Sequence, residues 1–196
     1  MAQPDPSARA VVLVEGNSDR LALEALAIRR GRDLAAEGVA VVPIGGAHAI
    51  GRFLQRLGPK GDAVLAGLCD VAEEVHFRRA LEQAGFGSEL TRTDLETLGF
   101  FVCVEDLEDE LIRALGQARV LEILDAQGDL SSFRTLQKQP AWRGRSPEKQ
   151  LQRFMGSGGS RKTVYAPLLV QALDLDRVPR SLDGVLAHVD RTVREL

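Results

Sequence analysis

The first half of the chain alternates short apolar runs with amphipathic stretches. Residues 10–14 read Ala-Val-Val-Leu-Val, a β-branched run typical of a buried parallel strand. The stretch 20–30 instead places its apolar residues on one helical face and ends at Gly31. The predicted strands are residues 10–14, 39–44, 62–68 and 100–104, and the predicted helices are 20–30, 47–57 and 73–84. Strands alternating with helices across short loops predict a doubly wound α/β fold with a four-stranded, mostly parallel sheet.

The second half has a different pattern, with no convincing strand from Leu107 onward. Its apolar positions predict short helices over residues 111–115, 120–126, 149–154 and 164–173. Residues 138–147 predict a loop, and the Gly/Ser segment 156–160 predicts a turn. We therefore predict three parts, which are a flexible N-terminus (1–9), an α/β domain (10–106) and a helical C-terminal region (107–196) packed on or next to it.

Acidic residues follow three of the four predicted strands. Glu15 comes after the first strand, Asp70 after the third, and Glu105 and Asp106 after the fourth. Asp19 lies one helical turn beyond Glu15, which returns it to the same rim. In an open parallel sheet, ligands bind outside the carboxyl ends of the strands. Carboxylates gathered there repel one another, and a hard divalent cation such as Mg²⁺ or Mn²⁺ relieves that repulsion.

The second strand ends in a glycine turn rather than an acid. Gly45 and Gly46 allow the backbone to approach a ligand closely. Each of the acids also has a simpler interpretation, because an acid in this position often only caps a helix or interacts with its dipole. Their joint placement at one edge of the sheet favours a metal site.

These segments resemble one known family in their order and spacing. The run Val-Val-Leu-Val-Glu15-Gly16-Asn-Ser-Asp19 is similar to the opening motif of a TOPRIM domain. Its Glu-x-x-x-Asp spacing resembles the variant found in nucleases of the OLD (overcoming lysogenization defect) family. Val-Pro-Ile-Gly45-Gly46 matches the turn after the second TOPRIM strand, and Gly-Leu-Cys-Asp70 matches the strand leading to the family's Asp-x-Asp pair. The resemblance covers about residues 10–110 and implies a Rossmann-like TOPRIM fold.

One position departs from the family pattern. The second aspartate of Asp-x-Asp falls at position 72, where this chain has Ala72. Glu73 or Glu74 can supply the missing carboxylate from the adjacent turn, and their spacing does not decide between them. If neither side chain reaches, one metal site is weakened or lost.

The resemblance also implies an acid after the fourth strand and a lysine further along the chain. Glu108 is the favoured acid and Glu105 the next, although this acidic run also suits a solvated helix start. Lys162 is the candidate lysine, in the role of neutralising charge on the scissile phosphate. An ordinary exposed lysine is the alternative.

The function implied by the resemblance is a metal-dependent DNA endonuclease that hydrolyses or nicks phosphodiester bonds. The expected catalytic residues are Glu15, Asp70 and Lys162, and the expected ligands of one or two Mg²⁺ or Mn²⁺ ions are Glu15, Asp19, Asp70, Glu73 and Glu108. Related OLD proteins carry an ATPase on the same chain, but no Walker motif occurs here, so any ATPase is expected to be a separate partner.

Two alternatives remain beside the nuclease. A catalytically weak or inactive TOPRIM module would bind nucleic acid or a separate ATPase without cutting, and Ala72 favours this reading. A primase- or topoisomerase-like role fits less well, because the chain is short for a polymerase and Tyr165 is its only tyrosine.

Composition narrows the class of protein. No apolar run approaches the roughly 20 residues that span a bilayer, and the N-terminus lacks the basic start and apolar stretch of a secretory signal. Cys69 and Cys103 are too few for a disulfide framework or a four-cysteine zinc site. We expect a cytoplasmic protein without membrane attachment, for which oligomerisation stays open.

The distribution of charge favours a nucleic-acid partner, although the net charge is only −3. Residues 131–162 hold eight Lys or Arg residues against one acid, a net charge of +7, so the rest of the chain carries −10. A basic stretch is often only a solvated face, but beside a carboxylate cluster it suits a DNA backbone. Trp142 within this stretch can stack on a base or anchor an interface. The expected DNA-binding residues are Gly46, Arg143, Arg145, Arg153, Arg161 and Lys162.

Overall fold

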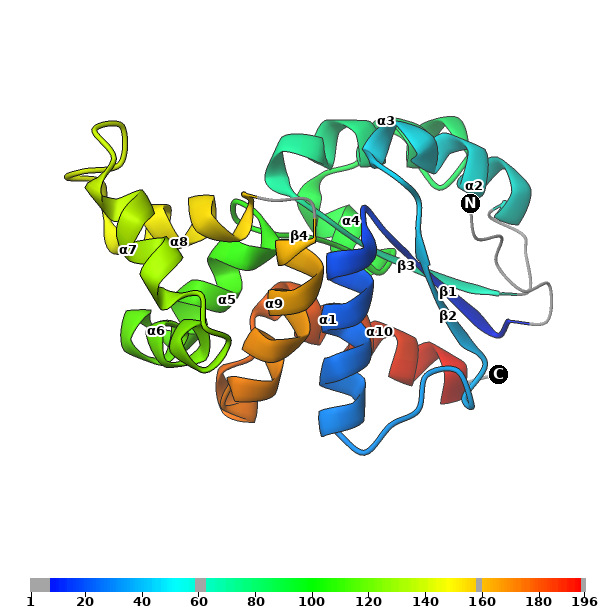
Figure 1. Ribbon diagram of the computed structural model, residues 1–196. Helices are drawn as coiled ribbons and strands as arrows, with labels where there is room; N and C mark the ends of the chain where they lie inside the picture. The colour runs from blue at the N-terminus through cyan, green and yellow to red at the C-terminus, as the bar shows by residue number, and fades with distance from the viewer. Residues whose placement is uncertain (1–7, 59–62, 158–159, 195–196) are drawn as a thin grey trace.

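The computed structural model describes residues 8–58, 63–157 and 160–194, and it contains a four-stranded parallel sheet (Figure 1). The strand order is β2-β1-β3-β4, and each of the three strand pairs is parallel. The strands are β1 (Ala10–Val14), β2 (Val39–Pro43), β3 (Val64–Cys69) and β4 (Phe100–Val102). The predicted α/β fold is confirmed. Residues 1–7 of the N-terminus predicted to be flexible lie outside the described residues.

The central strands are apolar throughout because both faces of the sheet are covered. In β1, Val12 and Val14 belong to one hydrophobic core, whereas Val11 and Leu13 belong to the other. Successive side chains of a strand point to opposite faces, so a strand between two helical layers needs apolar residues at every position. This is why residues 10–14 show no alternation of apolar and polar residues.

Helices form a layer on each face of the sheet (Figure 1). One layer consists of η1 (Ala47–Ala49), α2 (Ile50–Leu57), η2 (Val71–Glu73), α3 (Glu74–Gln83) and α4 (Arg92–Thr97). The other consists of α1 (Asn17–Arg29), α9 (Arg161–Ala172) and α10 (Arg180–Arg194), with η3 (Leu175–Arg177) between the last two. The C-terminal helices α9 and α10 therefore complete the α/β architecture itself.

The remaining helices extend from one side of the sheet as a separate lobe, on the left of Figure 1. This helical lobe comprises α5 (Leu107–Leu115), α6 (Gln117–Ala126), α7 (Leu130–Lys138) and α8 (Pro147–Met155). The chain returns from the lobe to the sheet through α9, which packs along α1. Arg29 at the end of α1 secures this packing, because its Nη1 donates to the carbonyl oxygens of Val170 (2.8 Å) and Leu173 (2.6 Å).

Three helices were missing from the sequence prediction, namely α4, α7 and α10. Helix α4 has six residues and α7 buries only Phe133 and Leu136, so neither shows a sustained 3.6-residue pattern. Helix α10 does carry a readable signal, because Leu182, Val185, Leu186 and Val189 recur on one face and are buried. No helix among the described residues is both long and apolar enough to cross a membrane.

Helix α5 begins at Leu107, one turn before its predicted start. Asp106 caps it, since Asp106 Oδ1 accepts a hydrogen bond of 2.8 Å from the backbone N–H of Asp109. The first turn is acidic, which suits the positive end of the helix dipole. Because acidic residues add nothing to an apolar periodicity, the sequence pattern did not predict this turn. The earlier start places Glu108 on a rigid helical turn.

We expect Gly184→Ala to destabilise the protein although Gly184 lies in a helix. A Cβ at this position would lie 2.2 Å from Cε1 of the Phe101 ring of β4. Overpacking of this kind costs about 1–3 kcal/mol, more than the gain of up to about 1 kcal/mol in helix propensity. Thermal denaturation should show a decrease in Tm of about 2–6 °C.

Gly51→Ala in α2 is the matched control, because a Cβ at Gly51 has no neighbour within 4 Å. This variant should keep or raise the Tm. An equal decrease in both variants would contradict the close packing of α10 on β4.

Candidate active site

The strand order creates a crevice between β1 and β3. From β1 the chain moves to β2 on one side and then returns to β3 and β4 on the other, so the direction of winding reverses there. Such a switch point is where open parallel sheets bind ligands. Glu15 follows β1 and Asp70 follows β3, and the backbone N–H of Asp70 donates to Glu15 Oε1 at 2.9 Å. Two acids 55 residues apart in the sequence are thus brought together, as their strand ends predicted.

Asp19 lies at the same rim, in the first turn of α1. Its Oδ2 accepts a hydrogen bond of 2.9 Å from the backbone N–H of Gly16, so it also caps the helix. Burial raises the pKa of Asp19 to about 7, and the charges of Glu108 and Glu15 add to this increase. The capping and metal-site interpretations of this acid are therefore compatible.

Glu108 and Lys162 meet beside these acids although they come from different helices. Glu108 lies in the first turn of α5 and is 2% exposed, whereas Lys162 lies in the first turn of α9 and is 42% exposed. Lys162 Nζ donates to Glu108 Oε2 at 2.8 Å. The other carboxylate oxygen, Glu108 Oε1, is buried without a hydrogen-bond partner among the described residues.

The crowding of carboxylates changes their protonation. Burial raises the pKa of Asp70 to about 8, and the charges of Glu15 and Asp19 raise it further. Burial also raises the pKa of Glu15, with a smaller contribution from the charge of Glu73. Without a cation, the cluster therefore retains protons at pH values where isolated carboxyl groups are ionised.

The chemistry of this cluster suits a hard divalent cation. An unpartnered buried oxygen at Glu108 and neighbouring carboxylates with raised pKa values are a set of oxygen donors that lacks positive charge. In their present conformations, no three His, Cys, Asp or Glu side chains of the described residues lie close enough together to hold an ion. The donors fit Mg²⁺ or Mn²⁺, but their side chains would have to turn toward it.

The structure distinguishes the two glutamates beside Ala72. The carboxylate of Glu74 is bonded to the guanidinium of Arg92 of α4. Glu73 has no such partner among the described arginines and lysines, and its charge raises the pKa of Glu15. Glu73 thus remains the candidate for the carboxylate that is absent at position 72.

The acids directly after β4 are used for structure. Glu105 is exposed and forms an ion pair with Lys149 of α8. Asp106 caps α5, and its Oδ2 accepts a hydrogen bond of 2.9 Å from Gln152 Nε2 of α8. These contacts support the preference for Glu108 over Glu105.

The glycine turn after β2 closes the crevice on the side opposite β3. The backbone N–H groups of Gly45 and Gly46 both donate to the carbonyl oxygen of Glu15 at 3.1 Å. Gly46 has a φ of 105°, and a Cβ there would meet nothing within 4 Å, so the turn leaves open space beside the acids. His48 follows this turn, and its ring contacts that of His76 with centroids 4.2 Å apart. This pair carried no sequence signal, because the two residues lie on different elements.

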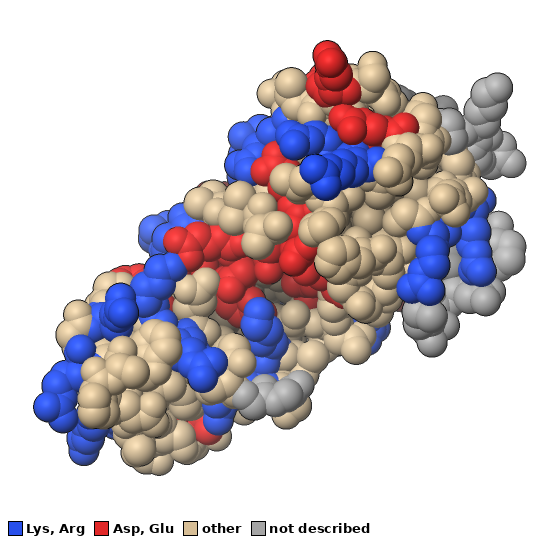
Figure 2. Space-filling view, turned by 90° about the horizontal axis from the view of Figure 1, so that it is seen from above, with Lys and Arg blue, Asp and Glu red and all other residues tan. Residues whose placement is uncertain are grey.

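The basic residues of the helical lobe flank the acidic crevice. Figure 2 shows Asp and Glu side chains gathered in a hollow between the α/β part and the lobe, with Lys and Arg around it. Arg143 and Arg145 are exposed in the loop before α8, and the guanidinium of Arg153 lies 5.8 Å from the centre of the Trp142 ring. Arg161 is more restrained, because its Nη1 donates to the carbonyl oxygen of Ser157 at 2.5 Å.

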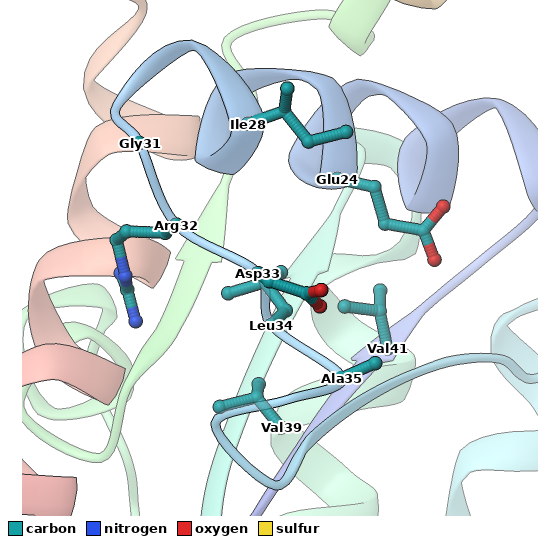
Figure 3. A pocket seen from close by; sticks show the side chains of 9 residues that line it. All are labelled: Glu24, Ile28, Gly31, Arg32, Asp33, Leu34, Ala35, Val39 and Val41. Atoms are coloured by element: carbon teal, nitrogen blue, oxygen red, sulfur yellow. The ribbon is translucent and has the colours of Figure 1, made fainter.

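An apolar pocket of about 520 Å³ lies away from these residues, between α1 and the outer strand β2 (Figure 3). Ile28, which is 71% exposed, and Val41 line it, whereas none of the predicted site residues does. Its lining is mainly apolar and includes two acids, Glu24 and Asp33, so it does not suit a phosphate. The crevice at the strand ends is therefore the better candidate for the active site.

The raised pKa values predict that the metal-free protein becomes less stable as the pH rises. Between the unfolded pKa of 3.8 and the folded value of about 8, the folded state binds more protons at Asp70 than the unfolded chain. The contribution of Asp70 to stability is therefore full below pH 3.8 and decreases as the pH rises toward 8. Asp70→Asn should weaken this dependence and raise stability at pH 8 by about 2 kcal/mol, or about 4–8 °C in Tm.

The measurement is thermal denaturation in EDTA at pH 5.5 and 8. Asp125→Asn, on the exposed surface of α6, is the control for the loss of one carboxylate. A Tm for Asp70→Asn that stays below that of the parent protein at pH 8 would show that repulsion among the acids is not the dominant effect.

This chain matches a family model and several solved structures of OLD or OLD-like proteins. Residues 8–60 match the family model described as "Overcoming lysogenization defect protein-like, TOPRIM domain". The C-terminal region of the Xanthomonas campestris pv. campestris OLD protein has a similar structure, with a TM-score of 0.74 and 23% identity over 96% of this chain and 95% of that one. The C-terminal region of the Burkholderia pseudomallei OLD protein gives a TM-score of 0.72 and 21% identity over 95% and 98% of the respective chains.

A search of curated proteins gave no match. The predicted resemblance is confirmed by the family match and by the fold. Residues 8–60 carry the signature of an OLD-like TOPRIM domain, and the chain over nearly its whole length has the fold of the C-terminal region of OLD proteins.

Proposed function

We propose that the protein is a metal-dependent DNA endonuclease that hydrolyses or nicks phosphodiester bonds. OLD-like TOPRIM domains are a family of nuclease domains. The observation that carries the proposal is the convergence of Glu15, Asp70 and the Glu108–Lys162 pair at the switch point of the sheet. Buried acids next to a lysine match the needs of a cation and an anionic phosphate at one place.

In this proposal one or two Mg²⁺ or Mn²⁺ ions are held by carboxylates of the crevice. The ligands are Glu15, Asp19, Asp70, Glu73 and Glu108, which come from the ends of β1 and β3, α1, η2 and α5. When bound, the cation supplies Lewis-acid polarisation of the phosphate group. It would also replace the protons that the acids retain in its absence.

The side chains themselves supply positioning and proton transfer. Lys162 presents its ammonium group at the crevice, where it would offset negative charge as the phosphate is attacked. Burial raises the pKa of Glu15, which makes its carboxylate a better acceptor for a proton from the attacking water. The open space at Gly46 leaves room for the sugar-phosphate backbone beside these groups.

The helical lobe would hold the DNA. Arg143, Arg145 and Arg153 are exposed on it, and Lys and Arg side chains surround the acidic hollow in Figure 2. Contacts of this kind with phosphates give affinity without sequence preference and weaken steeply as salt increases. A separately encoded ATPase and an oligomer remain predictions for the partners.

Incubation of the protein with supercoiled plasmid DNA tests the proposal. We expect nicked circles to accumulate in Mg²⁺ or Mn²⁺, to be absent in EDTA and to reappear when excess metal is restored. Because the lobe binds through charge, nicking at sub-saturating protein should decrease steeply between 50 and 200 mM salt. Intact plasmid in both metals, under conditions where the DNA is bound, would contradict the proposal.

A non-catalytic TOPRIM module is the second candidate. Ala72 at the position of a family aspartate favours it. This alternative predicts salt-sensitive DNA binding without binding of Mn²⁺ at millimolar concentration. Calorimetric titration of Mn²⁺ into the protein therefore separates the two candidates.

A further inference from the structure

A second pocket, of about 290 Å³, lies in the helical lobe, outside the carboxylate crevice. Helices α7 and α8, the loop between them and the first residue of α9 enclose it. Its lining combines aromatic, cationic and neutral hydrogen-bonding side chains, including Trp142, Phe154, Arg153, Arg161, Gln139 and Thr135. A pocket with all three kinds of side chain suits a planar, polar and partly anionic ligand.

The two aromatic rings of the pocket are each paired with a guanidinium. Arg153 lies 5.8 Å from the centre of the Trp142 ring, and Arg161 lies 4.1 Å from the centre of the Phe154 ring. Phe154 is buried, whereas Trp142 is only half-buried and contributes part of its surface to the pocket. Aromatic and guanidinium planes are the surfaces on which nucleobases stack.

Hydrogen bonds fix the positions of the residues that line the pocket. The backbone carbonyl of Trp142 accepts a hydrogen bond of 2.8 Å from Gln150 Nε2, and Gln150 is itself buried. Arg161 donates to the carbonyl oxygens of Phe154 and Ser157, which fixes its plane over the Phe154 ring. Gln139 is exposed at the rim, and its amide can donate to and accept from the edge of a base.

The pocket and the crevice share the start of α9. Arg161 lines the pocket, and the next residue, Lys162, is bonded to Glu108 in the crevice. Consecutive Cα atoms lie about 3.8 Å apart, so these two residues link the sites through a single peptide unit. The two sites are therefore neighbours along the chain, and one DNA strand would have to span only the start of α9 to occupy both.

We propose that this lobe pocket binds one unpaired nucleobase of the DNA strand whose phosphate lies in the crevice. This inference rests on the proposed function, because that proposal makes DNA the ligand. It does not require that the crevice cleaves the DNA. A base within a duplex is stacked and paired, so it has to leave the helix before it can enter such a pocket. The protein should therefore prefer single-stranded, gapped or frayed DNA over intact duplex.

Trp142 makes the test direct because it is the only tryptophan in the chain. Single-stranded oligonucleotides are titrated into the full chain in EDTA, with tryptophan emission and the anisotropy of a labelled strand recorded together. We expect the emission to be quenched along the binding curve, and blunt duplex of equal length to bind with much less quenching. If neither single-stranded DNA nor duplex quenches the emission when it binds, or if single strands do not bind, the pocket does not bind a base.

Substitutions and altered DNA give a second readout. Trp142→Ala should weaken single-strand binding by about 5- to 100-fold, the effect usual for a stacking aromatic. Arg143→Ala is the matched control, since Arg143 lies on the same loop but does not line the pocket. This substitution should weaken the binding of single-stranded and of double-stranded DNA to a similar degree, so the ratio of the two affinities should be unchanged.

Trp142 also packs against the hydrophobic core, so its replacement can disturb folding. Strands in which single bases are replaced by abasic units avoid this difficulty, because the protein is unchanged. A strand with an abasic unit at one particular position should no longer quench the emission. Equal quenching by strands with the abasic unit at every position would overturn the proposal. Glu15-dependent nicking without quenching would reject the pocket alone, and quenching without nicking would reject the nuclease alone.

Discussion

Replacement of Glu15 by Gln should reduce metal-dependent nicking by about 10³-fold or more. The substitution keeps the shape of the side chain, and its carbonyl oxygen can still accept the hydrogen bond from the Asp70 N–H. It removes the charge that a cation needs and the proton acceptor whose pKa is raised by burial. Loss of a general base alone costs about 10²–10⁴-fold, and loss of a ligand adds to it.

The measurement is the initial rate of nicked-circle formation at saturating Mn²⁺. Glu24→Gln provides the control, because Glu24 lies on α1 and forms an ion pair with Arg20 away from the crevice. We expect this variant to nick DNA at close to the parent rate. Parent-level rates in both Glu15→Gln and Asp70→Asn would exclude the crevice as the active site.

The pairing of Glu15 with Asp70 could be predicted from the sequence because it follows from topology alone. Both residues come directly after buried parallel strands, and such strands end at the same edge of the sheet. The apolar runs that identify these strands are short and continuous, so their ends were found within one or two residues. No knowledge of side-chain conformation was needed.

The pairing of Glu108 with Lys162 could not be predicted in the same way. Lys162 reaches the crevice because the chain leaves the sheet through the helical lobe and returns along α1 as α9. That return depends on tertiary packing of helices whose individual patterns are weak. Family resemblance identified both residues, but only the structure shows that they contact each other.

The choice between Glu73 and Glu74 also required the structure. The two are adjacent in the sequence, and either can reach toward a missing aspartate. The distinguishing contact comes from Arg92, which lies 18 residues beyond Glu74 and binds its carboxylate. Sequence spacing contains no information about such a partner.

Replacement of Lys162 by Met is the second substitution with a large expected effect. It should lower the nicking rate by about 10²–10³-fold, as the loss of one charged group that stabilises a transition state does. It should also destabilise the metal-free protein by about 2–3 kcal/mol, because Glu108 is 2% exposed and would lose its cation. The second effect complicates the first, since a poorly folded enzyme also cuts slowly.

The double variant Glu108→Gln, Lys162→Met tests the structural effect by itself. Without the Glu108 charge, loss of the lysine leaves no unpaired buried carboxylate, so the Tm in EDTA should return to near the parent value. Nicking should stay at least as low as in Lys162→Met, because both charged groups are gone. If Lys162→Met instead loses stability but nicks DNA at the parent rate in Mn²⁺, Lys162 only holds Glu108 in place. Recovery of the Tm in the double variant would show that the unpaired Glu108 carboxylate causes the instability of Lys162→Met. Because the double variant also lacks a proposed metal ligand, the rate that assigns the lysine to the reacting phosphate is that of Lys162→Met, measured at a temperature where this variant is folded. Lys162→Arg should then retain most of the stability while losing part of the rate, because a guanidinium keeps the charge but not the shape of the ammonium.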